Sequence, residues 1–182
     1  GIRNVSASGD YANKIGSLAF PDWIDEDSNR GAAARQELEA ELQTFKEEFA
    51  SLGVILGARY DGSPLIVSDG PSPPEDHRAV YMPSACPGGR APHYWINDKE
   101  SLYDSLGPWF TLLRLGPEAP RADDWVTASN ELGIPLSIVG IEEQGVRDLY
   151  EAPLALIRPD HHISWRGEAG DAAEILKTVN GR

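Results

Sequence analysis

The strongest pattern of apolar and polar positions in the chain lies between residues 31 and 52. Large apolar side chains recur there at alternating steps of four and three residues, and charged residues, mainly glutamates, fill the other face. The apolar positions are Leu38, Leu42, Phe45, Phe49 and Leu52. This spacing predicts an amphipathic helix from about Gly31 to Leu52, with Gly53 as its C-terminal stop. Because residues 1–30 offer little apolar surface to cover the stripe, we expect the helix to pack on the domain that follows or on a partner outside this chain.

The next stretch, residues 61–93, is rich in proline and glycine and predicts a loop that wraps a surface. Leu65-Ile66-Val67 predicts a short strand inside this loop. We place a domain boundary near residue 60. Residues 1–60 then form an N-terminal segment that contains the amphipathic helix, and residues 61–182 form a C-terminal domain.

From residue 92 onward, apolar runs alternate with amphipathic segments. They predict strands at 94–96, 109–115, 136–141, 154–158 and 162–166, and helices at 101–106, 122–132 and 171–179. The runs 109–115 and 136–141 are almost continuously apolar, which predicts a parallel and fully buried pair. The last two strands are joined by a tight turn at Pro159-Asp160 and form an antiparallel hairpin. This order predicts an α/β fold, a thioredoxin-like mixed sheet flanked by helices, preceded by the N-terminal amphipathic helix and the Pro/Gly-rich loop.

Two local details agree with the thioredoxin plan, and one departs from it. The segment Glu151-Ala152-Pro153-Leu154 resembles the proline segment before the thioredoxin hairpin, and Gly167 matches the glycine that ends the last strand. The Cys-x-x-Cys of thioredoxins is absent, and residues 116–121 stand in its place. Cys86 is the single cysteine of the chain, so dithiol exchange is excluded. This use of cysteine fits the cytosol.

The charge of the chain excludes two classes of partner. It carries 16 basic and 29 acidic residues, a net charge of −13 at pH 7, and such a field repels nucleic acid and acidic membrane surfaces. No apolar run approaches the roughly 20 residues of a membrane helix, and the first residues do not form a signal peptide. We therefore expect a soluble, cytoplasmic protein whose first residue, which is not Met, results from processing, cloning or cleavage.

Three motifs, in this order along the chain, carry a family resemblance. They are Leu56-Gly57-Ala58-Arg59-Tyr60 with Ser63-Pro64, Pro87-Gly88-Gly89-Arg90-Ala91-Pro92-His93-Tyr94-Trp95-Ile96, and Leu156-Ile157-Arg158-Pro159-Asp160 with Ile163-Ser164-Trp165-Arg166. Together they resemble the C-terminal region of class A FAD-dependent aromatic hydroxylases, which include the phenol, hydroxyphenylpropionate and polyketide hydroxylases. The resemblance covers roughly residues 35–182. His161 departs from the family pattern, which has glycine at this turn position, so the turn is either strained or of another type.

The resemblance implies a parent monooxygenase that hydroxylates a phenolic ring with FAD, NAD(P)H and O₂. A dinucleotide-binding fold needs a Gly-x-Gly-x-x-Gly turn, and the chain has no such string. We therefore expect that this chain binds neither FAD nor NAD(P)H, that it is not an enzyme alone, and that its partner is the flavin-binding domain of the parent. Its expected role is structural, in packing and assembly. The sequence leaves open whether the protein forms a homodimer.

The sequence offers no catalytic, cofactor-binding or metal-binding residue, but it offers candidates for a loop or interface. These candidates are Arg90, Pro92, His93, Arg158, Asp160, Trp165 and Arg166. Arg90 and His93 either contact the flavin domain or brace their own loop, and we expect Arg90 to donate to main-chain oxygens of the loop. His161 and His162 are adjacent, so in a strand they point to opposite faces and do not share a metal ion.

Two other functions remain open at this point. The first is a stand-alone thioredoxin-fold binding module without redox activity, in which the stripe of the amphipathic helix would be covered. A piece of a larger enzyme would leave that stripe partly exposed. The second is a one-cysteine redox enzyme acting through Cys86, for which a Pro-Gly-Gly loop supplies no visible activating base.

Overall fold

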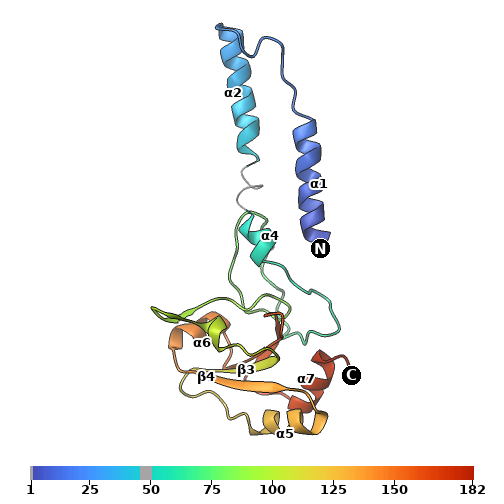
Figure 1. Ribbon diagram of the computed structural model, residues 1–182, viewed down its shortest axis with the longest axis vertical. Helices are drawn as coiled ribbons and strands as arrows, with labels where there is room; N and C mark the ends of the chain where they lie inside the picture. Colours follow the sequence, from blue (N-terminus) through green and yellow to red (C-terminus); the bar gives the residue numbers. More distant parts are fainter. Residues whose placement is uncertain (1, 46–50) are drawn as a thin grey trace. The chain divides into compact units, whose positions relative to one another are not determined.

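The structure is a computed structural model that describes residues 2–45 and 51–182. The chain divides into two compact units (Figure 1). Unit 1 consists of Gly1–Gly57 together with Asp76–Tyr81, and unit 2 consists of Ala58–Glu75 together with Met82–Arg182. Each unit is described by itself.

Unit 1 contains the helices α1 (Ile2–Gly16), α2 (Asn29–Gln43) and α4 (Leu52–Leu56). Helix α2 begins where the Ser28 side chain accepts a hydrogen bond from the Gly31 amide, as N-cap serines do. It coincides with the first part of the helix predicted over residues 31–52 but ends at Gln43. The predicted position Phe49 lies outside the described residues. Helix α1 has no counterpart in the prediction, because Gly9 and Asp10 in its middle indicate a turn.

The apolar stripe predicted over residues 31–52 is partly exposed at its described positions. Phe45 is buried and Leu38 is half-buried, but Leu42 is 47% and Leu52 57% exposed. Partial exposure is what the sequence predicts for a piece of a larger enzyme, whereas a stand-alone module would cover the stripe. Near its start, α2 also packs through small residues, because a side chain at Gly31 would collide with main-chain oxygens of the preceding loop.

Unit 2 is built on a four-stranded sheet in the order β4-β3-β5-β6. Its strands are β3 (Phe110–Leu115), β4 (Leu136–Ile141), β5 (Leu154–Ile157) and β6 (Ile163–Gly167). Strands β3 and β4 are parallel, as predicted, and the pairs β3/β5 and β5/β6 are antiparallel. A separate antiparallel pair consists of β1 (Trp95–Asn97) and β2 (Glu100–Ser101).

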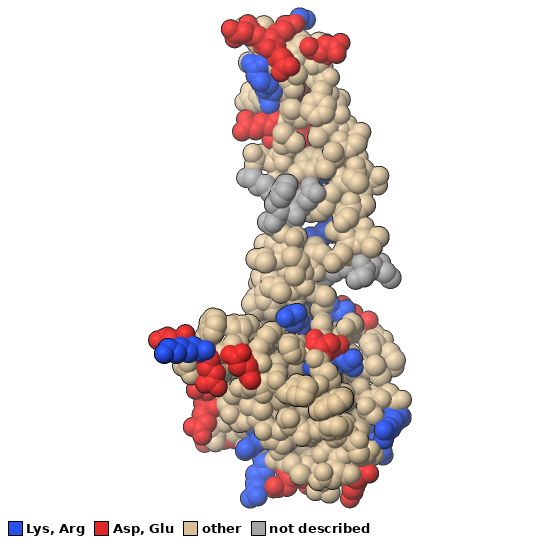
Figure 2. All heavy atoms as spheres, in the orientation of Figure 1, with Lys and Arg blue, Asp and Glu red and all other residues tan. Residues whose placement is uncertain are grey.

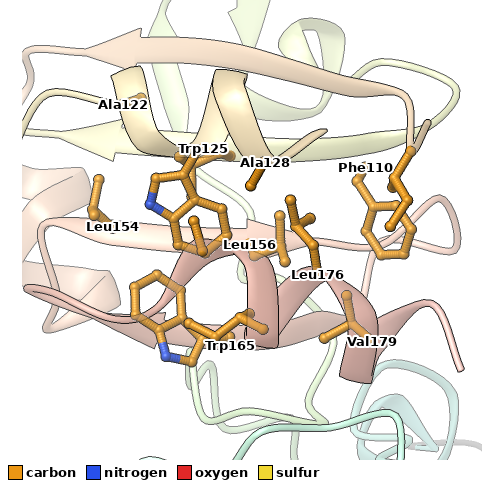
Figure 3. Packing of buried hydrophobic residues seen from close by; sticks show 13 residues of the cluster. Phe110, Ala122, Trp125, Ala128, Leu154, Leu156, Trp165, Leu176 and Val179 are labelled. Carbon is orange, nitrogen blue, oxygen red and sulfur yellow. The ribbon is translucent and has the colours of Figure 1, made fainter. Parts of the chain in front are cut away.

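Helices cover both faces of this sheet. Helices α5 (Asp123–Leu132) and α7 (Ala172–Val179) lie on one face, where Trp125, Leu156 and Leu176 belong to one buried cluster (Figure 3). The 3₁₀ helix η1 (Leu102–Ser105) and α6 (Gln144–Tyr150) contribute to a second cluster. Because neighbouring residues of β3 and β5 belong to different clusters, both faces of the central strands are buried.

Two strand predictions need correction. Strand β3 is buried except at Arg114, but β4 is mostly half-buried and was wrongly predicted to be fully buried. The reason is its place at the edge of the sheet, with β3 as its one neighbour. Residues 65–67 form no strand. A turn closes there between the Ile66 amide and the Ser63 carbonyl, and the Val67 amide alone reaches β6, at the Ser164 carbonyl (2.9 Å).

Acidic and basic side chains are distributed differently over the two units. On the face seen in Figure 2, both signs of charge are scattered over unit 2. In unit 1, the charged side chains on this face gather mainly around the loop between α1 and α2, and much of the remaining surface is uncharged. Within the described residues, no helix is long and apolar enough to cross a membrane.

Candidate functional site

The second and third sequence motifs lie side by side in unit 2. Segment 87–91 runs antiparallel to the hairpin turn and the start of β6. The Gly88 amide donates to the Ile163 carbonyl (2.7 Å), and the Ile163 amide donates to the Gly89 carbonyl (2.9 Å). The Ala91 amide donates to the His161 carbonyl (2.8 Å). This pairing brings candidates from distant parts of the sequence into one group of polar and aromatic side chains. We call it the hairpin cluster, and its members are Tyr60, Arg90, His93, Tyr103, Arg158, Asp160, His161 and His162.

Asp160 is the central acceptor of the hairpin cluster. Its carboxylate accepts hydrogen bonds from the Arg158 Nε (3.2 Å), the Tyr60 hydroxyl (3.2 Å) and the His162 amide (3.3 Å). Burial by itself would raise the pKa of Asp160, but the hydrogen bond and the charge of Arg158 outweigh it, and the pKa is lowered. The Asp160 charge in turn disfavours the phenolate of Tyr60 and raises the pKa of that hydroxyl.

The Tyr60 ring contacts both the His162 ring and the Arg158 guanidinium. The His162 ring lies 4.5 Å from it between centroids, and the Arg158 guanidinium lies 5.7 Å from its centre. The Tyr60 amide also donates to the Gly88 carbonyl (2.9 Å). The first sequence motif is thereby attached to the second and the third.

Arg90 acts differently from the prediction. Its half-buried side chain donates from Nε to the Tyr103 hydroxyl (3.2 Å) and lies 5.5 Å from the centre of that ring. Tyr103, not Arg90, donates to a main-chain oxygen, the carbonyl of Ala91. Predicted direct bonds from Arg90 to the loop backbone are therefore wrong for the described structure. Arg90 braces the loop through a tyrosine.

The other two candidates of the second motif occupy opposite environments. Pro92 is buried, and its carbonyl accepts a hydrogen bond from the Tyr150 hydroxyl (3.1 Å). His93 is exposed and makes edge contacts with the rings of Trp95 (4.9 Å) and Tyr103 (5.8 Å).

The turn of the hairpin contains backbone strain. His161 has φ +63°, in the left-handed region where a side chain is costly and glycine is not. The His161 ring lies 5.0 Å from the Tyr103 ring. The sequence left open a strained turn or a turn of another type, and the positive φ of His161 favours the strained one.

Trp165 and Arg166 lie outside the hairpin cluster. Trp165 is 6% exposed and belongs to the core, 5.0 Å from the Trp125 ring. Arg166 forms ion pairs with Asp69 (2.6 Å) and Glu151 (2.9 Å). Burial alone would lower the pKa of Arg166, but the hydrogen bonds to these two carboxylates outweigh it and the pKa is raised. Both residues are fixed in internal contacts.

Sequence reasoning missed two kinds of residue. Tyr103 and Asp69 are partners of candidate residues but lie far from them along the chain, so no local signal identifies them. Arg114 had a signal, as the one charged residue in the apolar run 109–115. It donates to the carbonyls of Pro120 (2.7 Å) and Ala119 (3.0 Å), which is the role predicted for Arg90.

The described residues hold no group of three or more His, Cys, Asp or Glu side chains placed to bind a metal ion. Cys86 is buried, with 8% exposed, and lines a hollow of about 180 Å³ together with Tyr60 and Asp69. Reactive cysteines are usually partly exposed and lie near a positive charge or a base. In the hairpin cluster, Arg158 and Asp160 contact each other and Tyr60, and Asp160 also accepts from the His162 amide, an arrangement that braces a loop.

Residues 84–182 match the family model described as "Aromatic-ring hydroxylase, C-terminal". The chain belongs to the aromatic-ring hydroxylase family. In an alignment 187 positions long, the chain is 35% identical to "Phenol 2-monooxygenase" of a Pseudomonas species, and the alignment covers 93% of the chain and 30% of the relative. It is 33% identical over 162 positions to "FAD-dependent monooxygenase opdD" of Penicillium oxalicum, with 86% and 30% covered. The chain thus spans about a third of the length of these relatives.

Solved structures show the same relationship. The rebeccamycin biosynthetic enzyme RebC with reduced flavin superposes with a TM-score of 0.83 at 27% identity, covering 99% of the hydroxylase chain and 34% of RebC. The flavin-dependent monooxygenase PieE, in complex with FAD and substrate, gives a TM-score of 0.67 at 27% identity and covers 88% and 31%. The mixed α/β architecture is therefore that of these enzymes.

The lowered pKa of Asp160 predicts a small, pH-dependent contribution to the stability of the hydroxylase chain. Its folded pKa lies below the unfolded value of about 3.9, so the carboxylate stabilises the fold above that pH and the contribution is lost as the pH falls through the folded pKa. We expect Asp160→Asn to lower the free energy of unfolding by about 0.2–1 kcal/mol at neutral pH, since the side chain is 37% exposed. Urea unfolding at a series of pH values measures this. A difference between the two proteins that persists unchanged far below about pH 4 would contradict the assignment.

Proposed function

We propose that this chain is the C-terminal part of an FAD-dependent aromatic monooxygenase and that its role there is structural. The enzyme hydroxylates a phenolic ring with NAD(P)H and O₂, and a flavin-binding domain outside this chain holds FAD and receives NAD(P)H. The observation that carries the proposal is the family match over residues 84–182, within relatives that include a phenol 2-monooxygenase. Tight binding of a dinucleotide requires a glycine-rich turn at a helix N-terminus, and this sequence has none. Its residues therefore do not fit FAD.

We also propose that residues 61–182 form a thioredoxin-like domain without redox chemistry. The sheet order β4-β3-β5-β6, with one parallel pair and a C-terminal hairpin, supports this assignment. Pro153 stands directly before β5, and Gly116 follows β3 at the position expected for a redox motif. Residues 1–60 then belong with the flavin and substrate module rather than with the sheet.

The structural role rests on how the family motifs are used. The backbone of Arg90 pairs with that of His162, and its side chain contacts Tyr103. Arg158 and Asp160 contact each other and Tyr60, which stabilises the hairpin turn against another loop. Residues that bind a substrate would instead converge on a hollow, with polar groups directed into it. We propose that unit 2 packs against the flavin-binding domain and braces it.

The test compares the 182-residue chain with the full-length protein. We expect the full-length protein to purify with bound FAD and to consume NAD(P)H while hydroxylating phenol. The chain alone should be colourless after gel filtration and should fail to reduce insulin disulfides, since one thiol does not complete dithiol exchange. Light scattering on both proteins determines whether a homodimer forms and which part it requires. Stoichiometric flavin on the isolated chain, or a flavin-free full-length protein, contradicts the proposal.

A further inference from the structure

Unit 1 has an inverted distribution of apolar side chains. Its described buried hydrophobic residues are Ala7, Ala34, Phe45 and Val54, of which two are alanines. Larger ones are exposed, namely Val5, Ile15, Phe20, Trp23, Leu42, Leu52, Ile55 and Val80. Unit 2, in contrast, buries both of its clusters between sheet and helices. A helical unit that exposes most of its described large apolar residues and buries only Phe45 and Val54 among them has a weak driving force to fold alone.

The exposed apolar residues include two that border a defined hollow. Residues of α1 and α4, with Ser51 before α4, line a hollow of about 460 Å³. Its apolar walls include Ile15 and Ile55, which are 50% and 60% exposed. Its polar lining residues are Asn4, Ser8, Tyr11 and Ser51. We call this surface the α1/α4 face.

Two charged side chains of α1 have partners inside unit 1. Asp10 forms an ion pair with Arg78 (2.8 Å). Lys14 donates to the Thr44 carbonyl (3.3 Å), and its ammonium lies 4.8 Å from the centre of the Phe45 ring. The residues that line the hollow are uncharged, some apolar and some polar. The partner that fits this surface therefore presents apolar side chains together with uncharged hydrogen-bonding groups.

Helix α1 also depends on packing for its stability. It has 15 residues, Gly9 in its interior and no acidic side chain in its first turn. Helices of this length are marginal in water even with good helix formers, and an interior glycine weakens them further. Packing against a partner would add the stabilising free energy that the sequence of α1 does not provide by itself.

The relatives indicate which partner this is. The hydroxylase chain covers 30% of the phenol 2-monooxygenase and 34% of RebC, so most of each relative lies outside the matched region. The match to RebC nevertheless covers 99% of this chain, helices of unit 1 included. In RebC the counterpart of unit 1 is therefore part of one polypeptide with a much larger unmatched region.

We propose that the flavin-binding part of the same polypeptide packs on the α1/α4 face, and that unit 1 becomes stably folded only when this contact is made. The proposal rests on the proposed function, because it takes its partner from there. It adds the surface that docks and the dependence of folding on docking. Unit 2 folds on its own core, whereas unit 1 is completed by the partner.

Hydrogen exchange read by mass spectrometry tests this on the 182-residue chain and on the full-length protein. In the isolated chain, we expect amides of α1 to exchange at least about a hundredfold faster than in the full-length protein. Amides of β3 and β5 should be equally protected in both. In the full-length protein, Ile15→Glu combined with Ile55→Glu should restore fast exchange in α1. Val126→Glu, on an exposed position of α5 (45%), is the matched control and should not.

Several outcomes overturn the proposal. Equal protection of α1 in both proteins would show that unit 1 folds stably without contact with the flavin-binding part. A dimer of the isolated chain that protects α1 would identify a second copy as the occupant. If the double glutamate variant fails to fold, Ile15→Ala with Ile55→Ala replaces it, and unchanged exchange in that variant also contradicts the docking. A flavin-loaded protein with fast exchange in α1 refutes the docking alone, whereas a flavin-free protein refutes the proposed function and with it the named partner.

Discussion

Replacing Trp165 by alanine should lower the free energy of unfolding by about 3–5 kcal/mol, the largest effect we expect from any candidate residue. The Trp165 side chain is 6% exposed, and its ring lies 5.0 Å from that of Trp125 in the layer between sheet and helices (Figure 3). Side chains added at Gly167 or Gly170 would strike the same ring. Its removal leaves a cavity bounded by sheet and helix backbone, which collapses poorly.

The matched control is Trp109→Ala. Trp109 is 58% exposed and stands directly before β3, so its loss should change the free energy of unfolding by at most about 0.5 kcal/mol. Urea unfolding followed by far-UV circular dichroism measures both variants. Losses of similar size in the two would mean that Trp165 is not part of a closely packed core.

Replacing Arg166 by alanine should lower the free energy of unfolding by about 2–3 kcal/mol. The Arg166 side chain is 11% exposed and holds Asp69, which is 18% exposed, and the Tyr150 carbonyl (3.0 Å). Without the guanidinium, a largely buried carboxylate and a carbonyl lose their donor. Glu151, at 70% exposure, adds little to this loss.

Arg121→Ala is the control for Arg166. The Arg121–Asp123 ion pair has a similar length (2.7 Å), but its side chains are 86% and 71% exposed, so its removal should cost no more than about 0.5 kcal/mol. Asp69→Asn together with Arg166→Met should recover part of the stability lost in Arg166→Ala, because no charge is then left buried without a partner. An Arg166→Ala variant as stable as Arg121→Ala would show that the segment around Asp69 is not held by this ion pair.

The sequence allowed the sheet of unit 2 to be predicted because its signals are local. Continuous apolar runs separated by amphipathic segments identify β3 and β4 as a parallel pair with a helical crossover. The same local pattern does not distinguish a central strand from an edge strand, so the exposure of β4 was missed. For unit 1, the period of the apolar residues predicted a helix with a partly exposed stripe, but not the close backbone approach at Gly31, which depends on the loop before the helix.

The hairpin cluster was predictable in part. Arg90, Arg158 and Asp160 were identified by their motifs, and His161 by its place in a turn that usually requires glycine. Their partners were not predictable, because Tyr60 lies 100 residues from Asp160 and no motif marks Tyr103 as the partner of Arg90. Such long-range partners follow from topology and leave no local trace in the sequence.

The pairing of Gly88 and Gly89 with Ile163 has a consequence for the order of synthesis. A ribosome makes segment 87–91 well before it makes β6, so the backbone groups that pair with residues 161–163 lack these partners during translation of the intervening strands and helices. The apolar layers of unit 2 then begin to form while the second motif still lacks the hydrogen-bond partners that the hairpin provides. The nascent loop receives its last hydrogen bonds only when the closing hairpin emerges.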